Sequence, residues 1–207
     1  MSRKYLVTAL LTLTLILFLA THIEIAKAQV PNGEILLGWP VTTKSNYAFV
    51  ARIGELNDSF DGQEVVLAIT GSTYVQVFAA NGSLVWETDM GQQILYGALD
   101  LANLDDDSFM EIAVATNGGL VLLDNDGTIL ATDNTLTNLR RVKMADLFGN
   151  GTHYIIVGNN AGQALVYKYD YKTGTLYKSS SIYSASFTTV VRWIDAGNLT
   201  GKGNLLI

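Results

Sequence analysis

The chain has 207 residues, of which 49% are hydrophobic and only 15% are charged, and its net charge is −6 at neutral pH. A composition this apolar supports a packed core and is not typical of disordered chains. The acidic balance argues against nucleic acid as a partner, because nucleic-acid binding needs a basic surface. The absence of cysteine excludes disulfides, thiolate metal sites and cysteine nucleophiles.

Residues 1–28 have the pattern of a signal peptide. A basic start precedes a sixteen-residue apolar run from Tyr5 to Ala20, and Ala26 and Ala28 are the small residues that a signal peptidase reads. The alternative is a retained anchor, but the run is shorter than the about 20 residues of a membrane-spanning helix. We expect cleavage after Ala28, a mature chain of net charge −8 without a stable membrane span, and a secreted, extracellular or cell-surface location.

A unit of about 47 residues recurs along the rest of the chain, and two-residue turn signals mark it. Asn-Gly and Asp-Gly pairs supply the positive φ angles that tight hairpins require. The glycines of these turns are separated by 49, 45 and 47 residues, which predicts one hairpin at the same place in each unit. The four turns are Asn32-Gly33, Asn81-Gly82, Asp126-Gly127 and Thr173-Gly174.

Each complete unit is expected to contain four short strands. Continuous apolar runs such as residues 65–69 suit strands covered on both faces, and no window after the signal peptide has sustained helical periodicity. The expected strands are residues 47–53, 64–70, 74–79 and 83–88, then 94–99, 111–116, 120–124 and 128–131, and then a strand from 139 to a loop at 146, followed by 154–157, 164–169 and 175–179.

Four strands in about 45 residues are the content of one propeller blade. The sequence therefore predicts an all-β fold, a β-propeller of four-stranded blades, with about three and a half blades present. Since propellers typically have about four to eight blades, we expect a fragment of a larger ring; the alternative is closure by association of copies. The expected parts are an N-terminal, ring-closing outer strand at 29–45, blades at 46–92, 93–135 and 136–183, and a truncated fourth blade at 184–207.

The stretch from Asn103 to Glu111 has the spacing of a calcium-binding loop. Asn103, Asp105 and Asp107 place side-chain oxygens at alternate positions, Phe109 would offer its main-chain carbonyl, and Glu111 would close the loop with a carboxylate. Calcium prefers six to eight such oxygen ligands. The alternative is a solvated acidic turn. Three consecutive aspartates repel one another without a cation, which favours calcium.

The corresponding loops of the other units carry fewer oxygens. The first loop is one residue longer and gives a second candidate set for calcium: Asn57, Asp58, Asp61 and Glu64. In the third loop, alignment of Asp146 with Asn103 leaves two oxygens and puts Tyr154 in place of the closing acid. The fourth loop has Lys202 at a ligand position and is expected to be metal-free.

Residues 32–41, 52–57 and 62–67 resemble the FG-GAP/VCBS-type repeats, also called integrin-alpha-like repeats. The resemblance extends over residues 32–207 and implies a propeller with structural Ca²⁺ in the loops between first and second strands. That family serves adhesion, carbohydrate-associated and scaffold roles, so the resemblance fixes no single function.

Residues 81–87 are similar to the tryptophan-bearing outer strand of quinoprotein propellers. The chain lacks the cysteines that form the vicinal disulfide of many such enzymes. We interpret Trp86 as a residue that packs between blades.

Motifs for catalysis are missing from the sequence: it has no nucleophile elbow, zinc-protease motif or phosphate loop. We interpret His153, the one histidine after residue 28, as structural or solvent-facing. A tyrosine cluster is expected to pack between blades; the alternative is a sugar- or protein-binding surface. Its members are Tyr167, Tyr169, Tyr171, Tyr177 and Tyr183.

We therefore expect a secreted, non-enzymatic binding, adhesion or scaffold protein with no catalytic residues and no cofactor besides calcium. Its ligand would be an extracellular protein or carbohydrate. The alternative is part of a propeller enzyme, a quinoprotein dehydrogenase or a polysaccharide-active enzyme, whose catalytic residues lie outside this chain.

Overall fold

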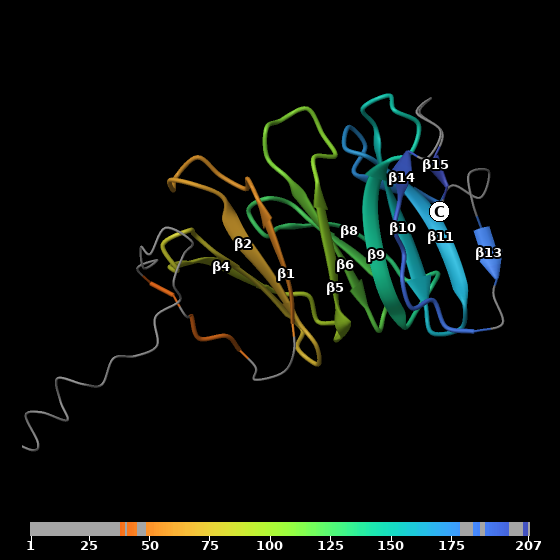
Figure 1. Cartoon of the computed structure of the whole chain (residues 1–207), viewed down its shortest axis with the longest axis horizontal. Coiled ribbons are helices and arrows are strands. Elements are labelled where there is room, and N and C mark those ends of the chain that lie inside the picture. The colour runs from red at the N-terminus through yellow and green to blue at the C-terminus, as the bar shows by residue number, and fades with distance from the viewer. Residues whose placement is uncertain are drawn as a thin grey trace, which may run out of the picture. The chain divides into compact units, whose positions relative to one another are not determined.

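The computed structural model describes residues 38–39, 41–44, 49–178, 184–186, 189–198 and 205–206. The chain divides into two compact units, residues 1–41 and 42–207, and every strand belongs to the second unit. Across the described residues all regular elements are β-strands, and no helix is long and apolar enough to cross a membrane (Figure 1). The expected signal peptide and most of the N-terminal outer strand lie outside the described residues, as do residues 187–188, 199–204 and 207 of the expected fourth blade.

The strands form three successive antiparallel sheets, each of which follows the chain order. The first sheet contains β1 (Phe49–Gly54), β2 (Glu64–Ile69), β3 (Tyr74–Phe78) and β4 (Leu84–Asp89). The second contains β5 (Ile94–Ala102), β6 (Glu111–Thr116), β7 (Leu120–Leu123) and β8 (Ile129–Asp133). The third contains β9 (Leu139–Asp146), β10 (His153–Asn159), β11 (Gln163–Asp170) and β12 (Thr175–Lys178), with β13 (Ser184–Ser186) also paired to β11.

The all-β class and the twelve strands expected in the first three units are confirmed, with β5 and β10 each three residues longer than expected. The hairpin glycines Gly82, Gly127 and Gly174 all have positive φ angles, as the turn signals predict, and Gly33 lies outside the described residues. A separate pair of short strands, β14 (Gly197–Asn198) and β15 (Leu205–Leu206), falls where the fourth unit is expected.

Both faces of the middle sheet are buried. In β6, Ile112 and Val114 belong to a core shared with the first sheet, whereas Ala113 and Ala115 belong to a core shared with the third. Successive strand residues point to opposite faces, so a strand between two cores must be apolar at every position. This arrangement explains the continuous apolar runs, and each fully buried aliphatic side chain contributes about 1.5–3 kcal/mol.

Polar contacts also join the first and second sheets. The indole Nε1 of Trp86 on β4 donates to the carbonyl of Asn125 in the β7–β8 turn, at 3.0 Å. Thr88 Oγ1 donates to the carbonyl of Gly127 in the same turn, at 2.7 Å. A Cβ on Gly127 would lie 2.6 Å from Thr88 Oγ1, so only glycine fits there. Trp86 therefore packs between the first and second sheets, as its sequence context predicts.

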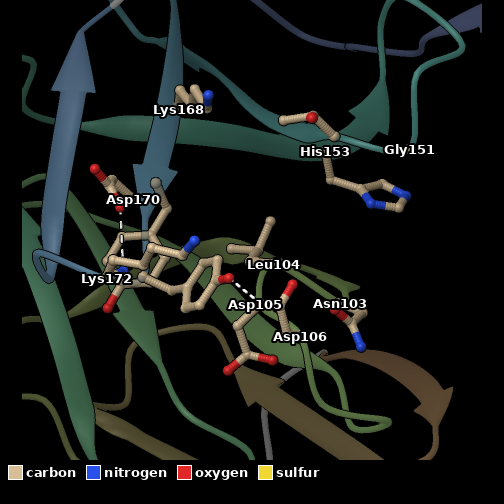
Figure 2. Close-up of a pocket in the computed structure, with 12 residues that line it drawn as sticks. Asn103, Leu104, Asp105, Asp106, Gly151, His153, Lys168, Asp170 and Lys172 are labelled. Atoms are coloured by element: carbon tan, nitrogen blue, oxygen red, sulfur yellow. Dashed lines mark hydrogen bonds between the residues drawn. The ribbon is translucent and has the colours of Figure 1, made fainter.

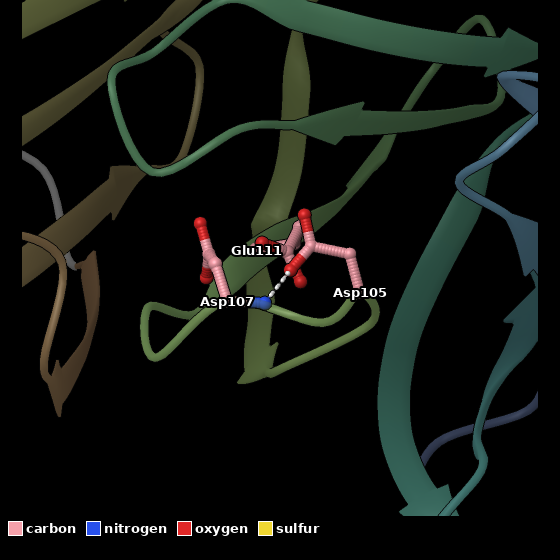
Figure 3. Close-up of side chains that lie close together, drawn as sticks. All are labelled: Asp105, Asp107 and Glu111. Atoms are coloured by element: carbon pink, nitrogen blue, oxygen red, sulfur yellow. Dashed lines mark hydrogen bonds between the residues drawn. The ribbon is translucent and has the colours of Figure 1, made fainter.

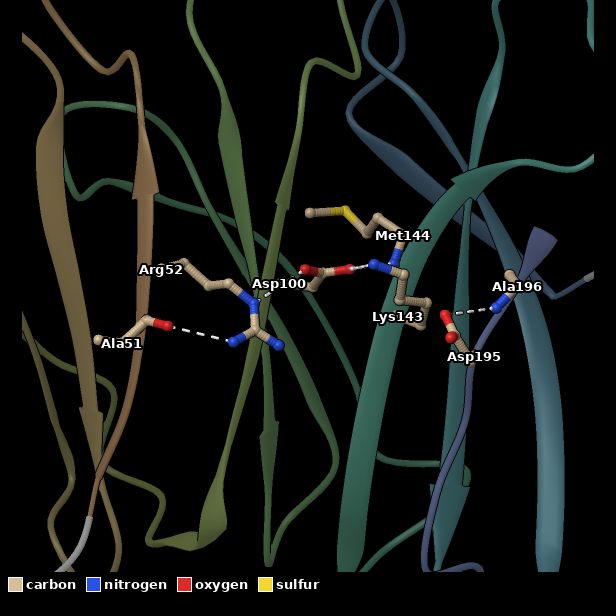
Figure 4. A network of polar contacts seen from close by, with 7 residues as sticks. All are labelled: Ala51, Arg52, Asp100, Lys143, Met144, Asp195 and Ala196. Carbon is tan, nitrogen blue, oxygen red and sulfur yellow. Dashed lines mark hydrogen bonds and ion pairs between the residues drawn. The ribbon is translucent and has the colours of Figure 1, made fainter.

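Asp100 connects the first strands of all three sheets (Figure 4). Its carboxylate lies 3.3 Å from Arg52 Nε on β1 and 3.2 Å from Lys143 Nζ on β9, and it accepts the N–H of Met144 at 2.8 Å. Asp100 is buried, and a buried carboxylate is tolerated only where it is paired and hydrogen-bonded. The network therefore fixes the position of β5 between β1 and β9.

Candidate metal-binding loop and adjoining pocket

Three carboxylates come together in the loop that joins β5 to β6. Oxygen atoms of Asp105, Asp107 and Glu111 all lie within 4.8 Å of one another, and Figure 3 shows the three side chains close together. Glu111 is the first residue of β6 and pairs with Ala102, the last residue of β5. The strand pairing thus holds the closing acid at the base of the loop.

The loop is shaped by its own side chains. Asp105 Oδ1 accepts the N–H of Asp107 at 2.9 Å, and Asp107 Oδ1 accepts the N–H of Phe109 at 2.7 Å. Each contact is an aspartate side chain that turns the chain two residues on. The Asn103 amide donates to the carbonyl of Asp107, which closes the loop across its width. These contacts fix the side chains of Asp105, Asp107 and Asn103 to the main chain of the loop.

Glu111 carries an unsatisfied buried oxygen. The side chain is only 1% exposed, its Oε2 accepts the N–H of Leu104, and its Oε1 has no hydrogen-bond partner among the described residues. Burial raises the pKa of Glu111 to about 7; the Leu104 N–H opposes the shift, and the charges of Asp105 and Asp107 add to it. A buried polar atom without a partner is costly, and a bound cation would provide one here.

The predicted calcium ligands of this loop thus divide into two groups. Asp105, Asp107 and Glu111 lie together, whereas Asn103 donates its amide N–H to the carbonyl of Asp107. The main-chain carbonyl of Phe109 stays a predicted ligand. Between the converging aspartates, Asp106 instead accepts a hydrogen bond from the Tyr171 hydroxyl on the third sheet.

The first loop repeats part of this arrangement. Glu64 Oε2 accepts the N–H of Leu56 at 2.8 Å, its Oε1 also lacks a partner, and Asn57 Oδ1 accepts the N–H of Ser59 at 2.8 Å. Ser59 therefore occupies the place that Asp107 has in the second loop. Asp58 and Asp61, the other two predicted ligands, are exposed. Within the part of the chain that the structure describes, only the second loop brings three acidic side chains within 4.8 Å.

The third loop, residues 146–154, has a different interior. Ala145 pairs with Tyr154 as Ala102 pairs with Glu111, so the alignment of Asp146 with Asn103 agrees with the strand register. The Phe148 and Tyr154 rings meet edge to face at 5.3 Å between centroids. An aromatic pair thus stands where the second loop has carboxylates. Lys202 of the fourth loop lies outside the described residues.

Asp146 binds the main chain of the third loop. Its carboxylate accepts the N–H groups of four residues at 2.7–3.2 Å, and these hydrogen bonds, that of Gly151 first, lower the pKa of Asp146. The four donors are Phe148, Gly149, Asn150 and Gly151. This carboxylate is therefore engaged by the loop itself.

A pocket of about 350 Å³ adjoins the second loop (Figure 2). One wall consists of residues 103–106, and the other consists of residues 151–153 and 168–172 of the third sheet. His153, interpreted from sequence as structural or solvent-facing, lines this pocket, and its Nδ1 is buried without a hydrogen-bond partner in the described part of the chain. The pocket joins residues 103–106 to residues 151–153 and 168–172, which are distant in sequence, so no local motif predicts it.

The tyrosine cluster divides between packing and the pocket. Tyr167 is buried, and its hydroxyl donates to Asp133 Oδ1 on the second sheet at 3.0 Å, as the packing interpretation predicts. Tyr169 and Tyr171 line the pocket. Tyr177 is half exposed, and Tyr183 lies outside the described residues.

Comparison of the chain with protein-family models and with curated proteins gave no match. The resemblance to FG-GAP/VCBS-type repeats therefore remains a prediction from the residues that carry it.

Proposed function

We propose that the chain is part of a secreted, calcium-stabilised β-propeller that acts as a non-enzymatic binding or adhesion module. Three consecutive antiparallel sheets support the propeller, because in each the first four strands follow the chain order and the sheet packs against the next through a shared core. In this proposal the sheets are blades, and β1, β5 and β9 are their innermost strands. The network of Asp100 with Arg52 and Lys143 ties these three strands together.

The observation that carries the calcium proposal is the Glu111 carboxylate. It is buried and has one unpartnered oxygen, and two further carboxylates lie within 4.8 Å. Two unit charges about 4 Å apart repel by about 4 kcal/mol at the effective dielectric of a protein surface. A divalent cation converts this repulsion into attraction and gives the free oxygen a partner.

The chemistry of the ligands favours calcium over other divalent ions. The three side chains offer only carboxylate oxygens, whereas zinc sites are dominated by histidine nitrogen and cysteine sulfur. Calcium also accepts irregular sets of six to eight oxygens, including main-chain carbonyls, while magnesium demands near-ideal octahedral geometry. A short loop with carboxylates and main-chain carbonyls suits calcium better.

The role of the cation in this proposal is structural. Glu111 accepts the N–H of Leu104 and so closes the β5–β6 loop, and Glu64 accepts the N–H of Leu56 at the same place in the β1–β2 loop. A glutamate that makes the same hydrogen bond to the loop main chain in two sheets has a structural role. Calcium bound to Glu111 would further stabilise the β5–β6 loop and the register of these two strands.

The test is calorimetric calcium titration of the secreted protein, with thermal melting in Ca²⁺ and in EDTA. We expect binding and a stabilisation of about 2.7 kcal/mol at a hundredfold excess of calcium over its dissociation constant. Asp105→Asn combined with Asp107→Asn should abolish both effects. The matched control is Asp58→Asn combined with Asp61→Asn in the first loop, which should retain them. A folded protein that neither binds calcium nor melts higher with it would refute the proposal.

A further inference from the structure

The pocket beside the second loop has the size and the lining of a small-ligand site. Its volume of about 350 Å³ lies within the range of about 300–1,000 Å³ that such sites occupy. Asp105 and Asp106 lie on one wall, and Lys168 and His153 lie across from them (Figure 2). The pocket therefore places hydrogen-bond acceptors and donors on opposite sides of one space.

The lining is mostly polar and contains two tyrosines, the buried Tyr169 and the half-buried Tyr171. Of the described residues that line the pocket, Leu104 alone has an aliphatic side chain. A peptide anchored by apolar side chains would find little to bury. A ligand rich in hydroxyl groups suits these walls, because each hydroxyl both donates and accepts hydrogen bonds.

Tyr171 is held in a fixed position. Its hydroxyl donates to Asp106 across the two sheets, and this hydrogen bond, with burial and nearby carboxylates adding, raises the pKa of Tyr171 to about 12. The phenol thus remains a neutral donor, and its ring is anchored at the edge of the pocket. A fixed aromatic ring provides contact area at low entropic cost.

His153 adds a half-buried imidazole to the lining. Its Nδ1 is buried and has no hydrogen-bond partner among the described residues, so a ligand in the pocket would reach the other edge of the ring. The imidazole therefore offers one further polar group to a ligand hydroxyl.

We infer that this pocket binds a neutral saccharide, a ligand class that deepens the proposed binding role and rests on it. The fixed ring of Tyr171 would contact one face of a sugar ring, and its hydroxyls would bind Asp106, His153 and Lys168. Outside the carboxylate cluster, Asp106 and Asp170 balance Lys168 and Lys172, so the lining has no net charge to attract an acidic sugar. Asp105 belongs both to the pocket and to the carboxylate cluster, so calcium would order one wall.

The test uses the secreted protein with saturating calcium and defined probes: cellotetraose, xylotetraose, mannotetraose and maltotetraose, each titrated and followed by calorimetry or NMR. We expect at least one to bind. Tyr171→Ala combined with Asp106→Asn should weaken binding about tenfold or more, the equivalent of about 1.4 kcal/mol. The matched control is Tyr177→Ala, an exposed tyrosine on β12 outside the lining, which should bind as the wild type does. Melting curves establish that each variant is folded.

Three results would overturn the inference: no binding of any probe up to about 10 mM, unchanged binding by the folded double variant, or preference for tetragalacturonate or a peptide library over neutral sugars. The calcium proposal fails separately. Saccharide binding without calcium binding would refute calcium alone, and calcium binding without saccharide binding would refute the pocket alone.

Discussion

The second and third loops make the same connection between strands but differ in how their acidic side chains are bound. Each joins the first strand of a sheet to the second, and residues 103–111 and 146–154 have equal length and equivalent strand register. The second loop gathers three carboxylates and leaves a buried oxygen unsatisfied. The third loop surrounds one carboxylate with four N–H groups and fills its interior with two rings.

Backbone conformation separates the two loops. Gly149 and Gly151 have φ angles of +68° and +82°, whereas no residue of the second loop has a positive φ. Left-handed residues turn consecutive N–H groups toward one anion, which a loop with ordinary φ angles does not do. The third loop therefore supplies hydrogen-bond donors to its own carboxylate, whereas in the proposed function the second loop would take a cation from solution.

The largest expected effect comes from exchanging the loops. Replacing residues 103–111 with the sequence of residues 146–154 should abolish the calcium response, about 2.7 kcal/mol at a hundredfold excess, while the protein stays folded. The wild type and the exchanged protein are compared by melting in Ca²⁺ and in EDTA. If the exchanged protein still gains stability from calcium, the second loop is not the binding site.

A smaller effect is expected at Gly151. An alanine there meets no atom within 4 Å, so its cost is the left-handed backbone alone, about 1–2 kcal/mol. The aligned residue of the second loop, Ser108, has no positive φ, and Ser108→Ala should cost far less. Urea unfolding measures both free energies. Equal costs at the two positions would contradict the proposed difference in backbone.

Local sequence patterns predict much of this contrast. Alternating oxygens identify Asp105, Asp107 and Glu111, and Asn-Gly and Asp-Gly pairs identify the hairpins, because these features depend on neighbours in sequence. The register of β9 and β10 also agrees with the alignment of Asp146 made from sequence.

Local sequence patterns do not predict contacts between segments that are distant in sequence. Asp100 bridges β1 and β9, and Tyr171 reaches Asp106 across 65 residues, so neither follows from local spacing. In the first loop, sequence gives Asp58 and Asp61 the same weight as Glu64. Only the folded chain shows that Glu64 is buried while the two aspartates are exposed.

The smallest expected effect is the pH dependence of the third loop. The N–H groups around Asp146 lower its pKa in the folded protein, so its contribution to stability is present above the ordinary aspartate pKa of about 3.9 and is lost as the pH falls through the lower, folded value. Asp146→Asn should therefore be less stable than the wild type at pH 7, and the gap should close toward pH 2. Asp126→Asn, at an exposed aspartate that accepts the N–H of Thr128, is the control and should give a smaller gap. Because the Asp146 carboxylate accepts main-chain N–H groups, EDTA should leave the stability difference between the wild type and Asp146→Asn unchanged. A difference that appears only with calcium would mean that the third loop also binds the ion.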